Sequence, residues 1–165
     1  MEVPVEYPSG QKWGNGTKMT KDVLITISGL QFADGADSEP VEIITSGVYY
    51  KKNGKHYILY DEVTEETCRT TKNIIKLGDE VVDITKRGEV NVHMMFEKNK
   101  KNVTYYYTPY GSLLIGIDAT KVLVEEKEHD LCVTVDYMLE INYEHMADCT
   151  ITMKVKSKNA GDFKI

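Results

Sequence analysis

The chain has 165 residues, 41% of them apolar, and a formal net charge of −6 at pH 7 with a pI near 5.3. This length fits one domain with one hydrophobic core, and the acidic balance argues against nucleic acid as a partner, because phosphate backbones are bound by basic surfaces. The sequence contains no long apolar run and no apolar stretch after Met1, so we expect no membrane insertion and no secretion, and we place the protein in the cytoplasm.

Residues 1–20 differ from the rest of the chain. They combine several Pro and Gly residues with the only tryptophan, Trp13, and show no sustained periodicity. We expect a flexible N-terminal arm at 1–20, a single strand-rich domain at 21–158 and a C-terminal tail at 159–165.

The first clear turn of the strand-rich domain is Asn53-Gly54, which lies between two alternating apolar segments. This pair predicts a two-residue type I′ hairpin, since both central residues of that turn need positive φ. The register then pairs Tyr50 with Tyr57 on one face and Tyr49 with Ile58 on the other. It continues through Gly47 opposite Tyr60 to Thr45 opposite Glu62. The expected strands are 23–32 and 41–51 before the turn, a third after it, and then 67–77, 81–86, 90–98, 103–108, 113–118, 121–126, 131–143 and 149–156.

These segments predict an all-β fold. Strands that follow one another with short turns favour an antiparallel meander of about 8–10 main strands, closed or nearly closed into a β-barrel. Helix content should be small, with at most one helical turn near Thr64. Strict alternation at 90–96 and 131–141 marks the core-facing sides of two strands. Neither face of the first hairpin is purely polar, which is typical of a barrel with a partly polar interior.

Sequence motifs for catalysis or metal binding are absent. The cysteines, Cys68, Cys132 and Cys149, form no CxxC pair and are expected to be small core or interface residues in a reducing compartment. The four histidines lack metal-ligand spacing, and no nucleophile elbow or phosphate-binding loop occurs. We therefore expect no catalytic residue, no metal site and no cofactor that the sequence can identify.

Carboxylates are numerous, and near pairs are expected by chance. Asp61, Glu62, Asp83 and Asp136 could form an acid and base pair for glycoside chemistry. A solvated outer surface is the preferred interpretation for all four, although Asp136 can face either side of its strand.

Four short strings in the chain carry a resemblance to a known family: Ser46-Gly47-Val48-Tyr49-Tyr50, Tyr57-Ile58-Leu59-Tyr60-Asp61-Glu62, Arg87-Gly88 and Tyr107-Thr108-Pro109-Tyr110-Gly111. In their order and spacing, from about residue 21 to 156, the chain resembles the YwiB-like family of bacterial proteins of unknown function. The resemblance implies a calycin (lipocalin)-like β-barrel in a bacterial cytoplasm. Since that family has no established activity, the resemblance implies no catalytic residue.

Three functions stay open: binding of a small apolar or amphipathic ligand in the barrel, contact of a side-chain-filled barrel with a protein partner, and catalysis in the barrel mouth. Whether the protein is an enzyme is uncertain, and we lean against it. Its oligomeric state is unknown. For a ligand we predict a tyrosine-lined opening at one barrel end, because tyrosine combines aromatic area with a hydroxyl and Arg87 is one of only two arginines. The predicted ligand-binding residues are Tyr49, Tyr60, Arg87, Tyr107 and Tyr110; the alternative is that these tyrosines cap the core.

Overall fold

The computed structural model describes residues 21–29, 42–128 and 130–158, and these form an all-β barrel, as predicted. Its ten strands are β1 (Lys21–Ser28), β2 (Glu42–Lys52), β3 (Lys55–Val63), β4 (Thr70–Gly78), β5 (Val81–Arg87), β6 (Val92–Glu97), β7 (Lys100–Thr108), β8 (Gly111–Glu126), β9 (Asp130–Ile141) and β10 (Glu144–Ser157). The N-terminal arm, Trp13 and the C-terminal tail lie outside the described residues.

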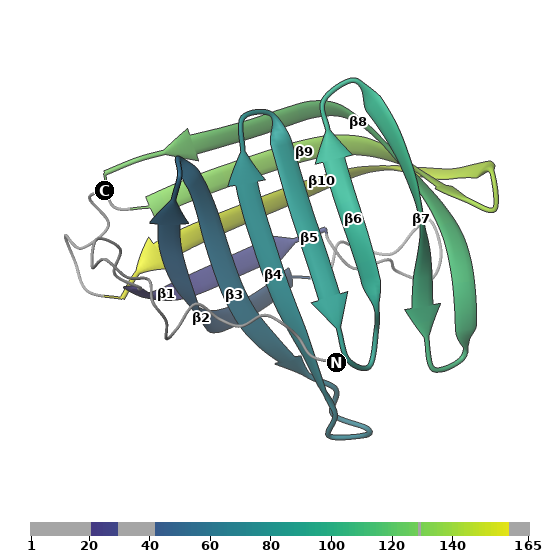
Figure 1. Ribbon diagram of the computed structural model, residues 1–165, viewed down its shortest axis with the longest axis horizontal. Coiled ribbons are helices and arrows are strands. Elements are labelled where there is room, and N and C mark those ends of the chain that lie inside the picture. The colour runs from purple at the N-terminus through teal and green to yellow at the C-terminus, as the bar shows by residue number, and fades with distance from the viewer. Residues whose placement is uncertain (1–20, 30–41, 129, 159–165) are drawn as a thin grey trace.

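Neighbouring strands pair antiparallel in the order β6-β5-β4-β3-β2-β1-β10-β9-β8-β7. The sheet curls so that β6 and β7 come together and nearly close the barrel (Figure 1). At this seam Asn91 and Tyr107 exchange two backbone hydrogen bonds of 2.9 Å. Further along, the Asn102 side-chain amide donates to the Met95 carbonyl oxygen at 2.9 Å. The seam is therefore held by one bridge and one side chain instead of a regular ladder.

The hairpin at Asn53-Gly54 forms as predicted. Both turn residues have positive φ, 53° at Asn53 and 77° at Gly54, and Tyr50 pairs with Tyr57 while Tyr49 pairs with Ile58. The ladder between β2 and β3 ends, however, at Val48 and Leu59. The expected pairings beyond this point, from Gly47 with Tyr60 to Thr45 with Glu62, are wrong, because β2 turns away along β1 while β3 continues along β4.

We expect Gly54→Val to lower the free energy of unfolding by about 1–3 kcal/mol, because a β-branched residue is strained at positive φ. A Cβ at Gly54 would meet no atom within 4 Å, so the backbone angle alone causes the loss. Thermal or urea unfolding measures it. Gly54→Asn is the matched control, since asparagine tolerates this conformation and should lose much less.

The core fills the centre of the barrel with side chains from all parts of the sheet. The alternating series predicted on β6 and β9 point inward, and Phe96 packs edge-on against Tyr137 with ring centroids 5.0 Å apart. Strand ends define two ends of the barrel: the β2–β3 end, which holds the Asn53-Gly54 turn, and the β3–β4 end, which holds the connection from β3 to β4. The centre is thus a packed core, and only the two ends remain for a polar site.

Two expectations need correction. The segments 113–118 and 121–126 are one strand, β8, because a bulge between Ala119 and Lys121 bends it without ending it. The stretch after Thr64 makes a single turn, as expected, closed by the Cys68 N–H donating to the Thr64 carbonyl at 2.7 Å. Cys68 is exposed there and is not a core residue, whereas Cys149 packs against the core.

In the described part of the chain, no helix has the length and apolar character needed to cross a membrane. Asp136 lies on the outer surface and accepts a hydrogen bond from the Thr150 hydroxyl at 2.9 Å, so its side chain faces outward.

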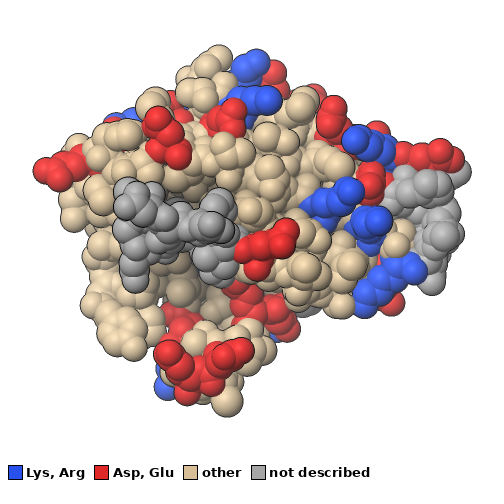
Figure 2. Space-filling model, turned by 180° about the vertical axis from the view of Figure 1, so that it is seen from behind, with Lys and Arg blue, Asp and Glu red and all other residues tan. Residues whose placement is uncertain are grey.

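Seen from behind, the surface is hollowed between the β3–β4 connection, which carries acidic side chains, and the β7–β8 turn to its left (Figure 2).

Candidate functional site

A polar cluster occupies the inner face of the barrel at the β3–β4 end. On β3, β4 and β5 the inward-facing series becomes polar at this end of the barrel, where it contains Glu62 on β3, Thr71 and Asn73 on β4, and Lys86 on β5. Neighbouring strands pair Glu62 with Thr71 and Asn73 with Lys86. Because side chains alternate across a strand, the register brings these polar groups together on the inside.

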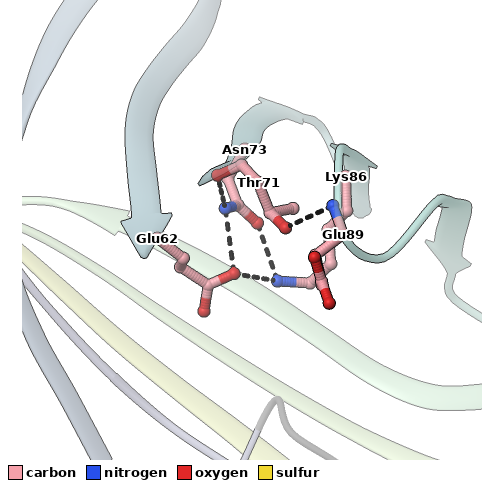
Figure 3. A network of polar contacts seen from close by, with 5 residues as sticks. All are labelled: Glu62, Thr71, Asn73, Lys86 and Glu89. Atoms are coloured by element: carbon pink, nitrogen blue, oxygen red, sulfur yellow. Dashed lines mark hydrogen bonds and ion pairs between the residues drawn. The ribbon is translucent and has the colours of Figure 1, made fainter. Parts of the chain in front are cut away.

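Hydrogen bonds connect the cluster (Figure 3). The Lys86 ammonium donates to Asn73 Oδ1 at 2.7 Å and to Glu62 Oε1 at 3.0 Å. The Asn73 amide donates to Glu62 Oε1 at 3.0 Å and to the Thr71 carbonyl at 3.3 Å. Lys86 is only 5% exposed, and a buried ammonium is stable only with such partners.

The connection from β5 to β6 covers one side of the cluster. The Glu89 backbone N–H donates to the Thr71 hydroxyl at 3.0 Å and ties this connection to β4. The Glu89 side chain is only 11% exposed, and its partners are distant: the Thr67 hydroxyl at 3.5 Å and Arg69 Nε at 4.0 Å. Glu89 is therefore a largely buried carboxylate held by long contacts.

The Tyr60 hydroxyl is the least satisfied polar group beside this cluster. Tyr60 is 4% exposed, and its buried hydroxyl has no hydrogen-bond partner. Burial, and secondly the charge of Glu62, raise the pKa of Tyr60 and of Tyr106. An unpaired buried hydroxyl costs about 1–3 kcal/mol, and a site that keeps one offers a bonding position to a ligand atom or a water.

The β2–β3 ladder ends beside Tyr60. Beyond Leu59 the strand β3 pairs only with β4, and the ribbons of β2 and β3 diverge toward the lower edge of the molecule (Figure 1), although Gly47 of β2 still lies close to Tyr60. Three partly buried apolar side chains, Val90, Tyr106 and Ile141, pack on the core at this end. The β3–β4 end therefore combines a buried polar cluster with an apolar rim; we call these residues together the mouth.

A second polar group lies at the β2–β3 end. The Tyr49 hydroxyl is hydrogen bonded to Nδ1 of His56 at 2.8 Å, and Nε2 of His56 lies 3.9 Å from Glu126. Burial lowers the pKa of His56; Glu126 opposes this effect, and Lys51 adds to it. Burial and Glu126 raise the pKa of Tyr49, so the tyrosine stays protonated and this pair is a structural hydrogen bond at neutral pH.

The lowered pKa of His56 predicts a pH dependence of stability. The unfolded chain binds a proton at His56 below its ordinary pKa of 6.5, whereas the folded protein resists protonation to lower pH. The contribution to stability is therefore complete above pH 6.5 and is lost as the pH falls through the folded pKa. Urea unfolding between pH 5 and 8 should show this slope.

The His56→Gln variant should lose the part of the pH dependence of stability that His56 causes. His93→Gln is the matched control, because His93 lies on the outer face against Asp83 at 2.8 Å. An unchanged slope in His56→Gln would contradict the assignment.

The five predicted ligand residues do not share one opening. Tyr49 lies at the β2–β3 end, Tyr60 in the mouth, and Arg87 and Tyr107 on the outer face, where Tyr107 stacks on Tyr105 at 5.9 Å. Tyr110 is 94% exposed in the β7–β8 turn. Strand alternation explains this separation, since Arg87 and Tyr107 follow the inward-facing Lys86 and Tyr106. The shared opening does not form, and a ligand role for each residue stays a prediction.

The sequence argument missed the central residues of the mouth, Asn73 and Lys86, and treated Glu62 as a solvated acid. The prediction for Glu62 is wrong, because its register position on β3 places it inside. A signal was available: on three consecutive strands the core-facing series ends in a polar residue at the same barrel end. Among the described residues, no group of three or more His, Cys, Asp or Glu is arranged to hold a metal ion.

Comparisons with known proteins agree with this architecture. Residues 25–153 match the family described as a domain of unknown function, DUF1934. The chain is 25% identical over 121 residues to YwiB, an uncharacterised β-barrel protein of Bacillus subtilis (strain 168), covering 72% of this chain and 84% of YwiB. The crystal structure of YwiB from Bacillus subtilis superposes with a TM-score of 0.72 at 19% identity, covering 85% of this chain and 94% of that one. This structural likeness supports the barrel fold.

Proposed function

Since this chain belongs to the DUF1934 family, whose members have no known function, we propose that its mouth binds a small amphipathic molecule. The polar group of the ligand would lie at Tyr60 and the Glu62–Lys86 pair, and its apolar part against Val90, Tyr106 and Ile141. The packed core leaves the centre of the barrel to side chains. We therefore place the ligand at the mouth, whereas the sequence had suggested a ligand inside the barrel.

The observation that carries the proposal is the unpaired hydroxyl of Tyr60. Natural proteins seldom bury a hydroxyl without a partner, and this one lies where the β2–β3 ladder ends and where a charged pair is already inside. Small-molecule sites combine an apolar lining with a few placed polar groups in this way.

Replacement of Tyr60 by phenylalanine separates a binding role from a structural one. Tyr60→Phe should raise the free energy of unfolding of the unliganded protein by about 1 kcal/mol, because it removes an unpaired buried hydroxyl. The same change should weaken ligand binding by about two- to tenfold, the range expected for one hydrogen bond of 0.5–1.5 kcal/mol. Tyr137→Phe is the matched control, since it also removes a buried tyrosine hydroxyl, which lies beside the Cys149 thiol, from a ring that packs edge-on against Phe96 in the core.

The measurement is equilibrium dialysis of the whole protein with three six-carbon probes, n-hexylamine, hexanoate and n-hexanol. The proposal predicts that at least one probe binds, with binding weakened by Tyr60→Phe and not by Tyr137→Phe. If no probe binds, or if both variants behave alike, the mouth is not a ligand site.

A second candidate function is contact with a protein partner. Four exposed side chains, Val103, Tyr105, Tyr107 and Tyr110, form a stripe on the outer side of β7 and its turn, and tyrosine is enriched at protein interfaces. Chemical cross-linking in cell extract should then capture a partner of defined mass, and Tyr105→Ser with Tyr107→Ser should abolish the cross-link. Absence of any such cross-link would exclude this candidate.

A further inference from the structure

The mouth holds two largely buried carboxylates. The side chains of Glu62 and Glu89 are 22% and 11% exposed. Lys86, whose side chain is 6% exposed, pairs with Glu62 at 3.0 Å. Arg69 approaches Glu89 only at 4.0 Å and is 74% exposed, so water screens most of its charge. Among the described residues, Glu89 is therefore a largely buried carboxylate without a close cationic partner.

The hydrogen-bond donors of the mouth are largely used, whereas two of its acceptors are not. Lys86 already donates to Glu62 and Asn73, and the Asn73 amide donates to Glu62 and to a backbone carbonyl. Glu89, by contrast, accepts only at long distance, and the Tyr60 hydroxyl oxygen has no partner. The mouth thus has spare acceptors at two positions and few spare donors.

The surface around the mouth adds to the negative field. The β3–β4 connection carries the exposed acids Glu65 and Glu66, and acidic side chains border the hollow in this face (Figure 2). The whole chain has a net charge of −6. A field of one sign at a cleft concentrates ligands of the opposite sign.

We infer that the polar group bound in the mouth is an organic ammonium, which donates to the Glu89 carboxylate and the Tyr60 hydroxyl oxygen. This inference rests on the proposed function and names its ligand class. An anionic ligand would face the carboxylate of Glu89, and the Lys86 ammonium already donates to Glu62 and Asn73. The aromatic rings of Tyr60 and Tyr106 at the mouth suit the same class, because aromatic rings attract ammonium groups.

The same three probes test the ligand class at pH 7.5, where hexylamine is a cation, hexanoate an anion and hexanol neutral. We expect hexylamine to bind at least about tenfold more tightly than either of the others, a ratio that corresponds to one added charge-assisted contact. Its affinity should fall as the salt concentration rises from 50 to 500 mM, because salt screens partly exposed charges.

Glu89→Gln should weaken hexylamine binding about tenfold and leave hexanol binding unchanged. Glu80→Gln is the matched control: it removes the same charge from an exposed position at the other end of the barrel, where Glu80 pairs with Lys98 at 3.5 Å. Thermal unfolding of both variants checks that the fold is retained. Glu62 is not used for this purpose, since its replacement disrupts the buried pair.

Two results would overturn the inference in different ways. If hexanol or hexanoate binds as tightly as hexylamine and Tyr60→Phe still weakens binding, the mouth is a ligand site but its ligand is not an ammonium. If none of the probes binds, the proposed function fails together with the inference.

Discussion

Glu62→Leu should lower the free energy of unfolding by about 3–5 kcal/mol, because it leaves the Lys86 ammonium buried without its carboxylate. Asn73 Oδ1 would remain as an acceptor at 2.7 Å, but a neutral amide compensates a buried charge only in part. Urea unfolding at pH 7 measures the loss, and the slope of the transition shows whether unfolding stays cooperative.

The double variant Glu62→Leu with Lys86→Met is the control for this effect. Removing both charges eliminates the uncompensated ammonium, and replacement of a buried ion pair by apolar residues of similar volume is often neutral or stabilising. The double variant should therefore recover most of the stability that the single variant loses. A single variant that loses less than about 1 kcal/mol would show that water reaches Lys86, and that the mouth is more open than its burial indicates.

Phe96→Ala should cost about 3–5 kcal/mol, the usual range for truncating a fully buried aromatic ring. Phe96 is completely buried and packs edge-on against Tyr137 in the centre of the barrel, so the variant leaves a cavity with no polar group to attract water. Thermal and urea unfolding measure the loss.

This variant also distinguishes a filled barrel from a hollow one. Leu123→Ala, on the outer face and 40% exposed, should change stability by no more than about 0.5–1 kcal/mol. If Phe96→Ala were as mild as Leu123→Ala, the centre would be a loosely packed cavity, and a ligand deep inside the barrel would again be the better hypothesis.

Local patterns in the sequence determined the strands and the first turn. Asparagine and glycine at 53–54 adopt the positive φ that a type I′ turn requires, and the alternation at 131–141 predicted which side of β9 is buried. The order of the strands also followed, because neighbours joined by short turns pair with each other. The bridge between Asn91 and Tyr107 then brings the two edges of the sheet together and nearly closes the barrel.

The mouth could be predicted only in part. Alternation places Glu62, Asn73 and Lys86 on the same face as the apolar residues two positions away in their strands, and this could have been read from the sequence. Their hydrogen bonds could not, since they depend on the register between three strands and on the connection that carries Glu89. The position of Tyr60 at the end of the β2–β3 ladder likewise depends on where that ladder stops, which no local pattern in either strand specifies.

The predicted ligand-binding residues also show which features the sequence determines and which the fold decides. Residue type identified tyrosine as a suitable ligand contact, but the barrel distributes Tyr49, Tyr60 and Tyr107 over two ends and an outer face. The side on which a strand residue lies follows from local alternation, which the sequence contains. Which strand ends meet, and which buried groups remain unpaired, follows from contacts between residues far apart in the chain, and these exist only in the folded barrel.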